Sequence, residues 1–160
     1  MVFTVLTFVP IQIYNDMEHR VNIYQSEPKA FEGMFALEQF LNDSPLNKQQ
    51  ISLIKMRASQ INGCAYCINM HTDEAIKASD THKRLHMLNA WQESPLFSEE
   101  EKVMLKITEE ITLINQSGLT DKTYQDAQQL FDGKTITAII MTATTINAWN
   151  RIAISTRMTG

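Results

Sequence analysis

One stretch of the chain decides its fold, residues 57–72, which read RASQINGCAYCINMHT. Asn62-Gly63 interrupts this stretch, and such a dipeptide is typical of turns. Before the turn, apolar side chains recur at spacings of three and four over about residues 48–61, which predicts an amphipathic helix. After the turn, we expect a second helix that begins near Cys64 and ends near Ala78.

Further helices are predicted on both sides of this pair. One helix is expected to start at Ser26-Glu27-Pro28 and to end near Asn42, and another to be capped at Asp80 or Thr81 and to end near Trp91. A capping box of Ser98 and Glu101 predicts a helix that includes Ile114 and ends by Gly118. A short helix should run from Thr120 to a stop at Asp132-Gly133, and a last one from about Lys134 to Arg157. Strands do not alternate with these helices, so the predicted fold class is all-α.

The composition indicates one ordinary globular domain. The chain has 160 residues, of which 44% are hydrophobic and 20% charged, and its formal net charge is −4. Nucleic acid is not an expected partner, because binding to its backbone needs clustered Lys and Arg. No segment is long and apolar enough to predict a membrane span, so no membrane partner is expected either.

The first residues differ from the rest of the chain. Residues 1–16 are apolar as far as Pro10, which suggests a short extended segment. They are either an upstream extension before a natural start at Met17, or an arm that packs on a neighbouring subunit. The helical domain is expected to cover residues 17–160. The apolar start has no basic residue before it and no small-residue cleavage site, so we expect a cytoplasmic protein and no signal peptide.

The chain has two cysteines, which form a Cys-x-x-Cys-x-x-x-His motif of Cys64, Cys67 and His71. Spacings of three, four and seven return to the same face of a helix. The first turn of a helix favours an anion, so a thiolate there is stabilised and reactive. One thiolate would attack a peroxide O–O bond, the second thiol would close a disulfide, and an external dithiol would reduce it. His71 would take or supply the proton. This chemistry needs no metal and no organic cofactor.

Other interpretations of the cysteine pair remain open at this point. A structural zinc site would need a fourth ligand, which would come from His82, His86 or another subunit. The two cysteines could also be buried and inert, because free Cys packs like a small hydrophobic residue. A thioredoxin-like motif is disfavoured, since no βαβ pattern surrounds the pair.

Residues 57–72 closely resemble the AhpD-like alkylhydroperoxidases of the carboxymuconolactone decarboxylase family. The resemblance continues in LNAWQE at 88–93, TEEIT at 108–112 and INAWNR at 146–151, and covers about residues 17–157. It implies an all-helical, oligomeric fold, commonly a trimer or hexamer. It also implies that Cys67 attacks the peroxide, that Cys64 resolves the sulfenic acid, and that the reductant is a lipoyl or thioredoxin-like dithiol.

Ser52 is the main departure from the family pattern. In the family, a Glu twelve residues before the first Cys joins the proton relay of the His71 counterpart, whereas this chain has Ser52 there. A Ser hydroxyl is too weakly acidic to act as a general base. Three outcomes are then open. The enzyme is slow, another carboxylate serves in place of the Glu, or the chain carries out a different thiol chemistry. The candidate carboxylates are Glu38, Asp73, Glu74 and Glu109.

Two neighbours of the motif are expected to line the substrate pocket. Tyr66 lies between the cysteines, where the best-studied branch of the family has His, and Met70 is adjacent to His71. The leading hypothesis is a thiol-dependent peroxidase that reduces alkyl hydroperoxides and is weakened by Ser52. The alternative is a non-catalytic oligomeric protein whose cysteine pair senses oxidation or is structural.

The relay hypothesis predicts the effect of Ser52→Glu. Loss of a general base typically costs about 10²–10⁴-fold in rate, so its return should raise peroxide turnover. Consumption of an organic hydroperoxide with excess dithiol measures the gain. An unchanged rate would count against a relay at this position.

Overall fold

The computed structural model describes residues 20–158, and within this range the regular structure is helical throughout. The elements are α1 (Ile23–Ser26), the 3₁₀ turn η1 (Pro28–Phe31), α2 (Glu32–Asn42), α3 (Lys48–Asn62), α4 (Ala65–Lys77), α5 (His82–Met87), the 3₁₀ turn η2 (Leu88–Ala90), α6 (Glu99–Thr112), α7 (Asp121–Leu130) and α8 (Gly133–Thr156). The all-α prediction is confirmed. The segment 1–16 lies outside the described residues. Between residues 20 and 158, no helix has both the length and the apolar character that crossing a membrane requires.

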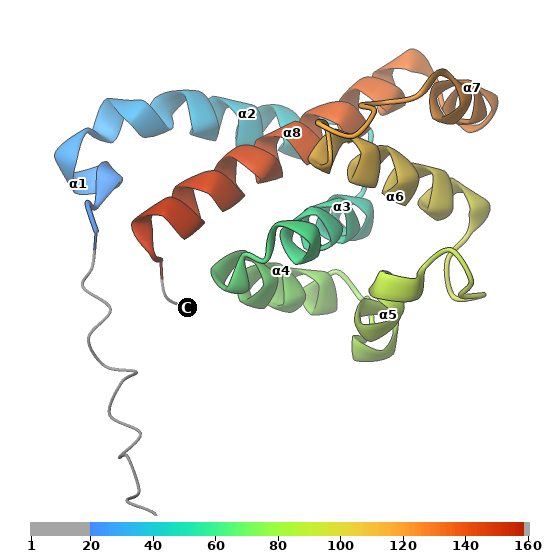
Figure 1. Cartoon of the computed structure of the whole chain (residues 1–160), viewed down its shortest axis with the longest axis horizontal. Helices are drawn as coiled ribbons and strands as arrows, with labels where there is room; N and C mark the ends of the chain where they lie inside the picture. Colours follow the sequence, from blue (N-terminus) through green and yellow to red (C-terminus); the bar gives the residue numbers. More distant parts are fainter. Residues whose placement is uncertain (1–19, 159–160) are drawn as a thin grey trace, which may run out of the picture.

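Helix α3 is the centre of the fold. It packs against α4, α6 and α8, while α2 lies along α8 and α7 packs on α6 (Figure 1). Its side chains Leu53 and Ile54 are fully buried, as are Leu105 of α6 and Ile139 of α8. Burial of apolar side chains of this size contributes about 1.5–3 kcal/mol each, so α3 supplies much of the core.

Side-chain caps fix where most helices begin. The predicted capping box of Ser98 and Glu101 opens α6, and Thr81 and Thr120 cap α5 and α7. Helix α3 begins with a second capping box, in which Asn47 and Gln50 exchange hydrogen bonds with each other's backbone N–H groups. These caps supply acceptors for N–H groups that have no partner within the helix.

Two sequence predictions on helix limits were wrong. Ser26 does not start the first long helix but ends the short α1, and the chain then forms η1 before α2 begins at Glu32. A proline fits an early helical position, and here it starts a 3₁₀ turn in place of an α-helix. Ile114 lies beyond the end of α6 and is 60% exposed, because α6 already ends at Thr112.

The turn between α3 and α4 is held by hydrogen bonds to α8. Gly63 closes α3 with φ 68°, a left-handed conformation that glycine adopts without a steric penalty. Asn62 Nδ2 donates to Asn147 Oδ1 at 2.9 Å and to Asn150 Oδ1 at 2.8 Å. Asn150 Nδ2 in turn donates to Ser59 Oγ at 3.0 Å. This polar cluster fixes the position of the chain directly before Cys64.

Asn150→Ala should destabilise the protein, because it leaves the Ser59 hydroxyl and one Asn62 contact without a buried partner. We expect a loss of about 1–3 kcal/mol in the free energy of unfolding, measured by urea denaturation. Asn69→Ala is the matched control, since Asn69 is exposed on α4 and should change stability little. Equal losses of unfolding free energy in Asn150→Ala and Asn69→Ala would show that the polar cluster adds no particular stability.

Candidate active site

The cysteine pair lies at the start of α4. Cys64 is the N-cap residue, and its Sγ accepts a hydrogen bond from the backbone N–H of Cys67 at 3.3 Å. A disulfide joins Cys64 to Cys67. Both residues are nearly inaccessible, with exposed fractions of 1% and 2%. The anion-stabilising helix start therefore acts most directly on the sulfur of Cys64.

Beside Cys67 lies a cavity of about 250 Å³ with two kinds of wall. Four charged or titratable side chains line it, namely Glu38, Lys55, His71 and Glu74. The rest of the lining is apolar or aromatic, namely Tyr66, Met70, Trp149, Ala153 and Met158. The structure thus places Cys67, His71, Tyr66 and Met70 around one cavity that combines apolar surface with groups able to carry protons.

His71 and Glu74 form a hydrogen-bonded pair on α4. His71 Nδ1 donates to Glu74 Oε2 at 2.7 Å, so the neutral imidazole carries its lone pair on Nε2. His71 is 2% exposed, and its Nε2 has no hydrogen-bond partner within residues 20–158. The bond from His71 holds the pKa of Glu74 below its ordinary value, helped by the positive charge of Lys55. Glu74 therefore orients His71 as a proton acceptor.

Glu38 and Lys55 form an ion pair on another wall of the cavity. Lys55 Nζ lies 2.8 Å from Glu38 Oε2, and Trp149 Nε1 donates to Glu38 Oε1 at 2.9 Å. The Lys55 side chain is only 8% exposed. Both oxygens of the Glu38 carboxylate are therefore held, one by α3 and one by α8, and the ammonium group is fixed inside the cavity.

Ser52 does not line this cavity. It is buried on α3, three residues before Lys55, so it lies one turn away on the same side of the helix. Of the carboxylates considered as substitutes for a Glu at this position, Glu38 and Glu74 line the cavity. Glu109 instead pairs with Arg57 at 2.7 Å in a separate hollow, and Asp73 is exposed on α4.

Four lining residues were not assigned to a site by the sequence analysis, namely Lys55, Trp149, Ala153 and Met158. A lysine on the face of α3 that packs inward was a usable signal, because a buried lysine needs a partner. The partner Glu38 comes from a different helix, so periodicity alone did not reveal it. Met158 follows the end of α8, where no motif marks it.

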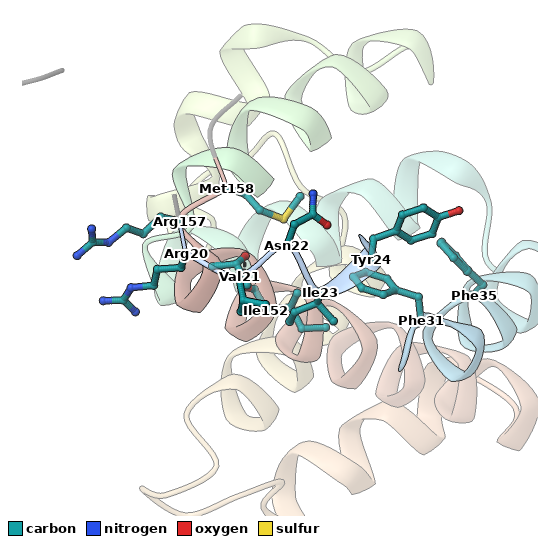
Figure 2. A pocket seen from close by; sticks show the side chains of 11 residues that line it. Arg20, Val21, Asn22, Ile23, Tyr24, Phe31, Phe35, Ile152, Arg157 and Met158 are labelled. Atoms are coloured by element: carbon teal, nitrogen blue, oxygen red, sulfur yellow. Dashed lines mark hydrogen bonds between the residues drawn. The ribbon is translucent and has the colours of Figure 1, made fainter. Parts of the chain in front are cut away.

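A larger hollow of about 460 Å³ lies between α1, η1 and the end of α8 (Figure 2). Aromatic rings of Tyr24 and Phe31 meet there at 5.7 Å between centroids, and Phe35 extends this apolar wall. Its lining contains neither a cysteine nor a histidine, and it shares Met158 with the cavity beside Cys67. It therefore carries no thiol chemistry of its own.

The histidines weighed as zinc ligands lie elsewhere. His82 and His86 are exposed on α5 and line none of the hollows described above. In the part of the chain that the structure describes, no three His, Cys, Asp or Glu side chains are grouped so as to hold a metal ion.

Comparison with known proteins places the chain among similar sequences and structures. The model of the carboxymuconolactone decarboxylase family matches residues 28–110. The uncharacterised protein YdfG of Bacillus subtilis (strain 168) is 37% identical over 139 residues, covering 87% of this chain and 95% of that protein. A protein of unknown function from Agrobacterium tumefaciens, provisionally described as the antioxidant defence protein AhpD, has a crystal structure with a TM-score of 0.84 at 34% identity, covering 89% of this chain and 97% of that chain. An uncharacterised peroxidase-related protein from Silicibacter sp. TM1040 shares the fold at 23% identity, with a TM-score of 0.74 and coverage of 85% and 72%.

Glu74→Gln tests the orienting role of the carboxylate. We expect peroxide turnover to fall by about 10–10²-fold, because the charge that holds His71 in the accepting tautomer is lost. The neighbouring Asp73→Asn removes the same charge from an exposed position and should change little.

The same pair predicts a pH dependence in the wild type. Since the pKa of Glu74 is depressed below its ordinary 4.5, the carboxylate stays ionised as the pH falls to that value, and its contribution is lost only at lower pH. Steady-state rates over an acid pH series measure this. If Glu74→Gln and Asp73→Asn lowered the rate of peroxide turnover equally, a specific role for Glu74 would be contradicted.

Proposed function

Because the chain belongs to the carboxymuconolactone decarboxylase family and is AhpD-like, we propose that it is a thiol-dependent peroxidase that reduces alkyl hydroperoxides. One observation carries the proposal. Cys67, which is disulfide-bonded to Cys64, lines a partly apolar cavity together with a histidine whose buried Nε2 has no hydrogen-bond partner among residues 20–158. A hydroperoxide would place its hydrocarbon against Trp149 and Met70 and its oxygens beside the sulfur.

The oxidative half begins from the dithiol. His71 Nε2 accepts the proton of Cys67, and the thiolate attacks the terminal oxygen of the hydroperoxide. The S–O bond forms as the O–O bond breaks, the alkoxide takes a proton, and the products are an alcohol and Cys67 sulfenic acid. Cys64 then attacks this sulfur, which forms the disulfide and releases water.

The reductive half uses an external dithiol. Attack of one donor thiolate on Cys67 would form a mixed disulfide and expel Cys64 as a thiolate. The Cys67 N–H, which donates to Cys64 Sγ, would stabilise that leaving group. The second donor thiol would then displace Cys67, which releases the oxidised donor and restores the dithiol. The near-complete burial of both cysteines favours a slim reductant or an opening of the site. A lipoyl or thioredoxin-like donor, a trimer or hexamer, and a cytoplasmic location stay predictions.

The alternative function is a thiol redox sensor that reacts once and does not cycle. Burial of the disulfide favours it, because a reductant reaches such a bond slowly. The two functions differ in turnover. An enzyme consumes many equivalents of hydroperoxide per chain with excess dithiol, whereas a sensor consumes about one.

Serine variants of the two cysteines test the proposed division of roles. Cys67→Ser should abolish hydroperoxide consumption, because the attacking sulfur is lost. Cys64→Ser should still react once and accumulate a sulfenic acid, which dimedone traps and mass spectrometry locates at Cys67.

Two results would overturn the peroxidase assignment. One is wild-type consumption that stops after a single equivalent, which would favour the sensor. The other is turnover that persists in Cys67→Ser, which would show that the cysteine pair does not carry the reaction. Trapping of a sulfenic acid at Cys64 in Cys67→Ser, with none at Cys67 in Cys64→Ser, would reverse the roles of the two sulfurs.

A further inference from the structure

We propose that Lys55 is a catalytic residue of this site, and that its ammonium group binds the oxygen that leaves when the peroxide O–O bond breaks. The inference rests on the proposed function and adds a residue to which no role has been assigned above. It starts from the position of Lys55, a buried cation that lines the same cavity as Cys67 and His71.

The burial of Lys55 needs a reason beyond packing. Placing an ammonium group in a protein interior is costly, and an ion pair in such a place is often no more stabilising than apolar side chains of similar size. Lys55 nevertheless lies 8% exposed on α3, with Glu38 as its counter-ion. A buried charge that lines the same cavity as the cysteine is a candidate for a functional position, because a few polar groups in a largely apolar pocket orient its ligand.

The ammonium group is fixed but retains hydrogen-bonding capacity. Glu38 receives one bond from Lys55 and another from Trp149, so the carboxylate and the ammonium are both held in place. An ammonium group has three N–H donors. Within residues 20–158, Glu38 is the one hydrogen-bond partner of Lys55 Nζ, which leaves two donors for a substrate oxygen in the cavity.

The charged and titratable groups of the cavity have separate roles. His71 and Glu74 lie on α4 with Cys67, and Lys55 faces them from α3. The charge of Lys55 contributes to the lowered pKa of Glu74, so its field reaches the His71 side of the cavity. His71 is thus suited to take the thiol proton, and Lys55 is suited to the negative charge that develops on the substrate.

This arrangement gives a balanced step. The Cys67 thiolate bonds to the terminal oxygen of the hydroperoxide while the O–O bond breaks and its electron pair moves to the alkoxide oxygen. Lys55 donates a hydrogen bond to that oxygen as it becomes negative. The proton that His71 took from Cys67 then passes to the alkoxide, so the products are the alcohol and the sulfenic acid, and Lys55 stays an ammonium.

Two oxidants of nearly equal size test this role. Ethyl hydroperoxide expels ethoxide, a strong base that needs stabilisation, whereas peracetic acid expels acetate, which needs very little. The variants compared are Glu38→Gln, which keeps Lys55, and Glu38→Gln/Lys55→Met, which removes the ammonium without leaving an unpaired carboxylate. The rate of Cys67 oxidation is measured in single turnover with pre-reduced protein, so the reductant does not enter.

The double variant should react more slowly than Glu38→Gln with ethyl hydroperoxide, by about 10²-fold, as for loss of one preorganised donor. With peracetic acid the two variants should differ no more than a few-fold. Circular dichroism checks that each double variant folds. If Glu38→Gln/Lys55→Met does not fold, Glu38→Gln/Lys55→Gln replaces it in the comparison with Glu38→Gln.

Each other result has a definite meaning. Equal slowing with both oxidants, or no slowing with either, would overturn the role of Lys55 and leave the peroxidase assignment intact. Failure of wild-type Cys67 to react with either oxidant would instead overturn the peroxidase assignment, and the role of Lys55 with it.

Discussion

The fold around the site depends on the hydrogen bonds between Asn62 and helix α8. Asn62 ends α3, and its amide donates to both Asn147 and Asn150. Because Gly63 then turns in a left-handed conformation, Cys64 is delivered as the N-cap of α4 at a fixed angle to α3. The sulfurs on α4, the ammonium on α3 and the aromatic wall on α8 therefore keep their relative positions through one buried polar cluster, where each lost contact is costly.

The cavity beside Cys67 shows how charge is balanced in a small, partly open space. Two carboxylates and one ammonium line it, and each carboxylate has an assigned neighbour, His71 for Glu74 and Lys55 for Glu38. Carboxylates from α2 and α4 reach the cavity, although position 52 of α3 is a serine.

The sequence predicted the parts of the molecule that depend on near neighbours. The turn at Asn62-Gly63 and the capping box of Ser98 and Glu101 were predicted because a few adjacent residues determine them. The 3₁₀ turn before α2 was missed, since short helices take their form from packing. Within the site, the Cys-x-x-Cys-x-x-x-His spacing predicted a shared helix face, whereas the pairing of Lys55 with Glu38 depends on how α2 docks and has no local signal.

A residue shortly after the end of helix α8 connects three hollows of the protein. Arg157 follows the helix with φ 55°, and Met158 comes next. Met158 lines the cavity beside Cys67 and the aromatic hollow between α1, η1 and α8. It also lines a third hollow, of about 200 Å³, together with Cys64. A shift of Met158 would therefore change the walls of all three hollows together. The surroundings of the two cysteines and the shape of the aromatic hollow are thereby coupled through one side chain.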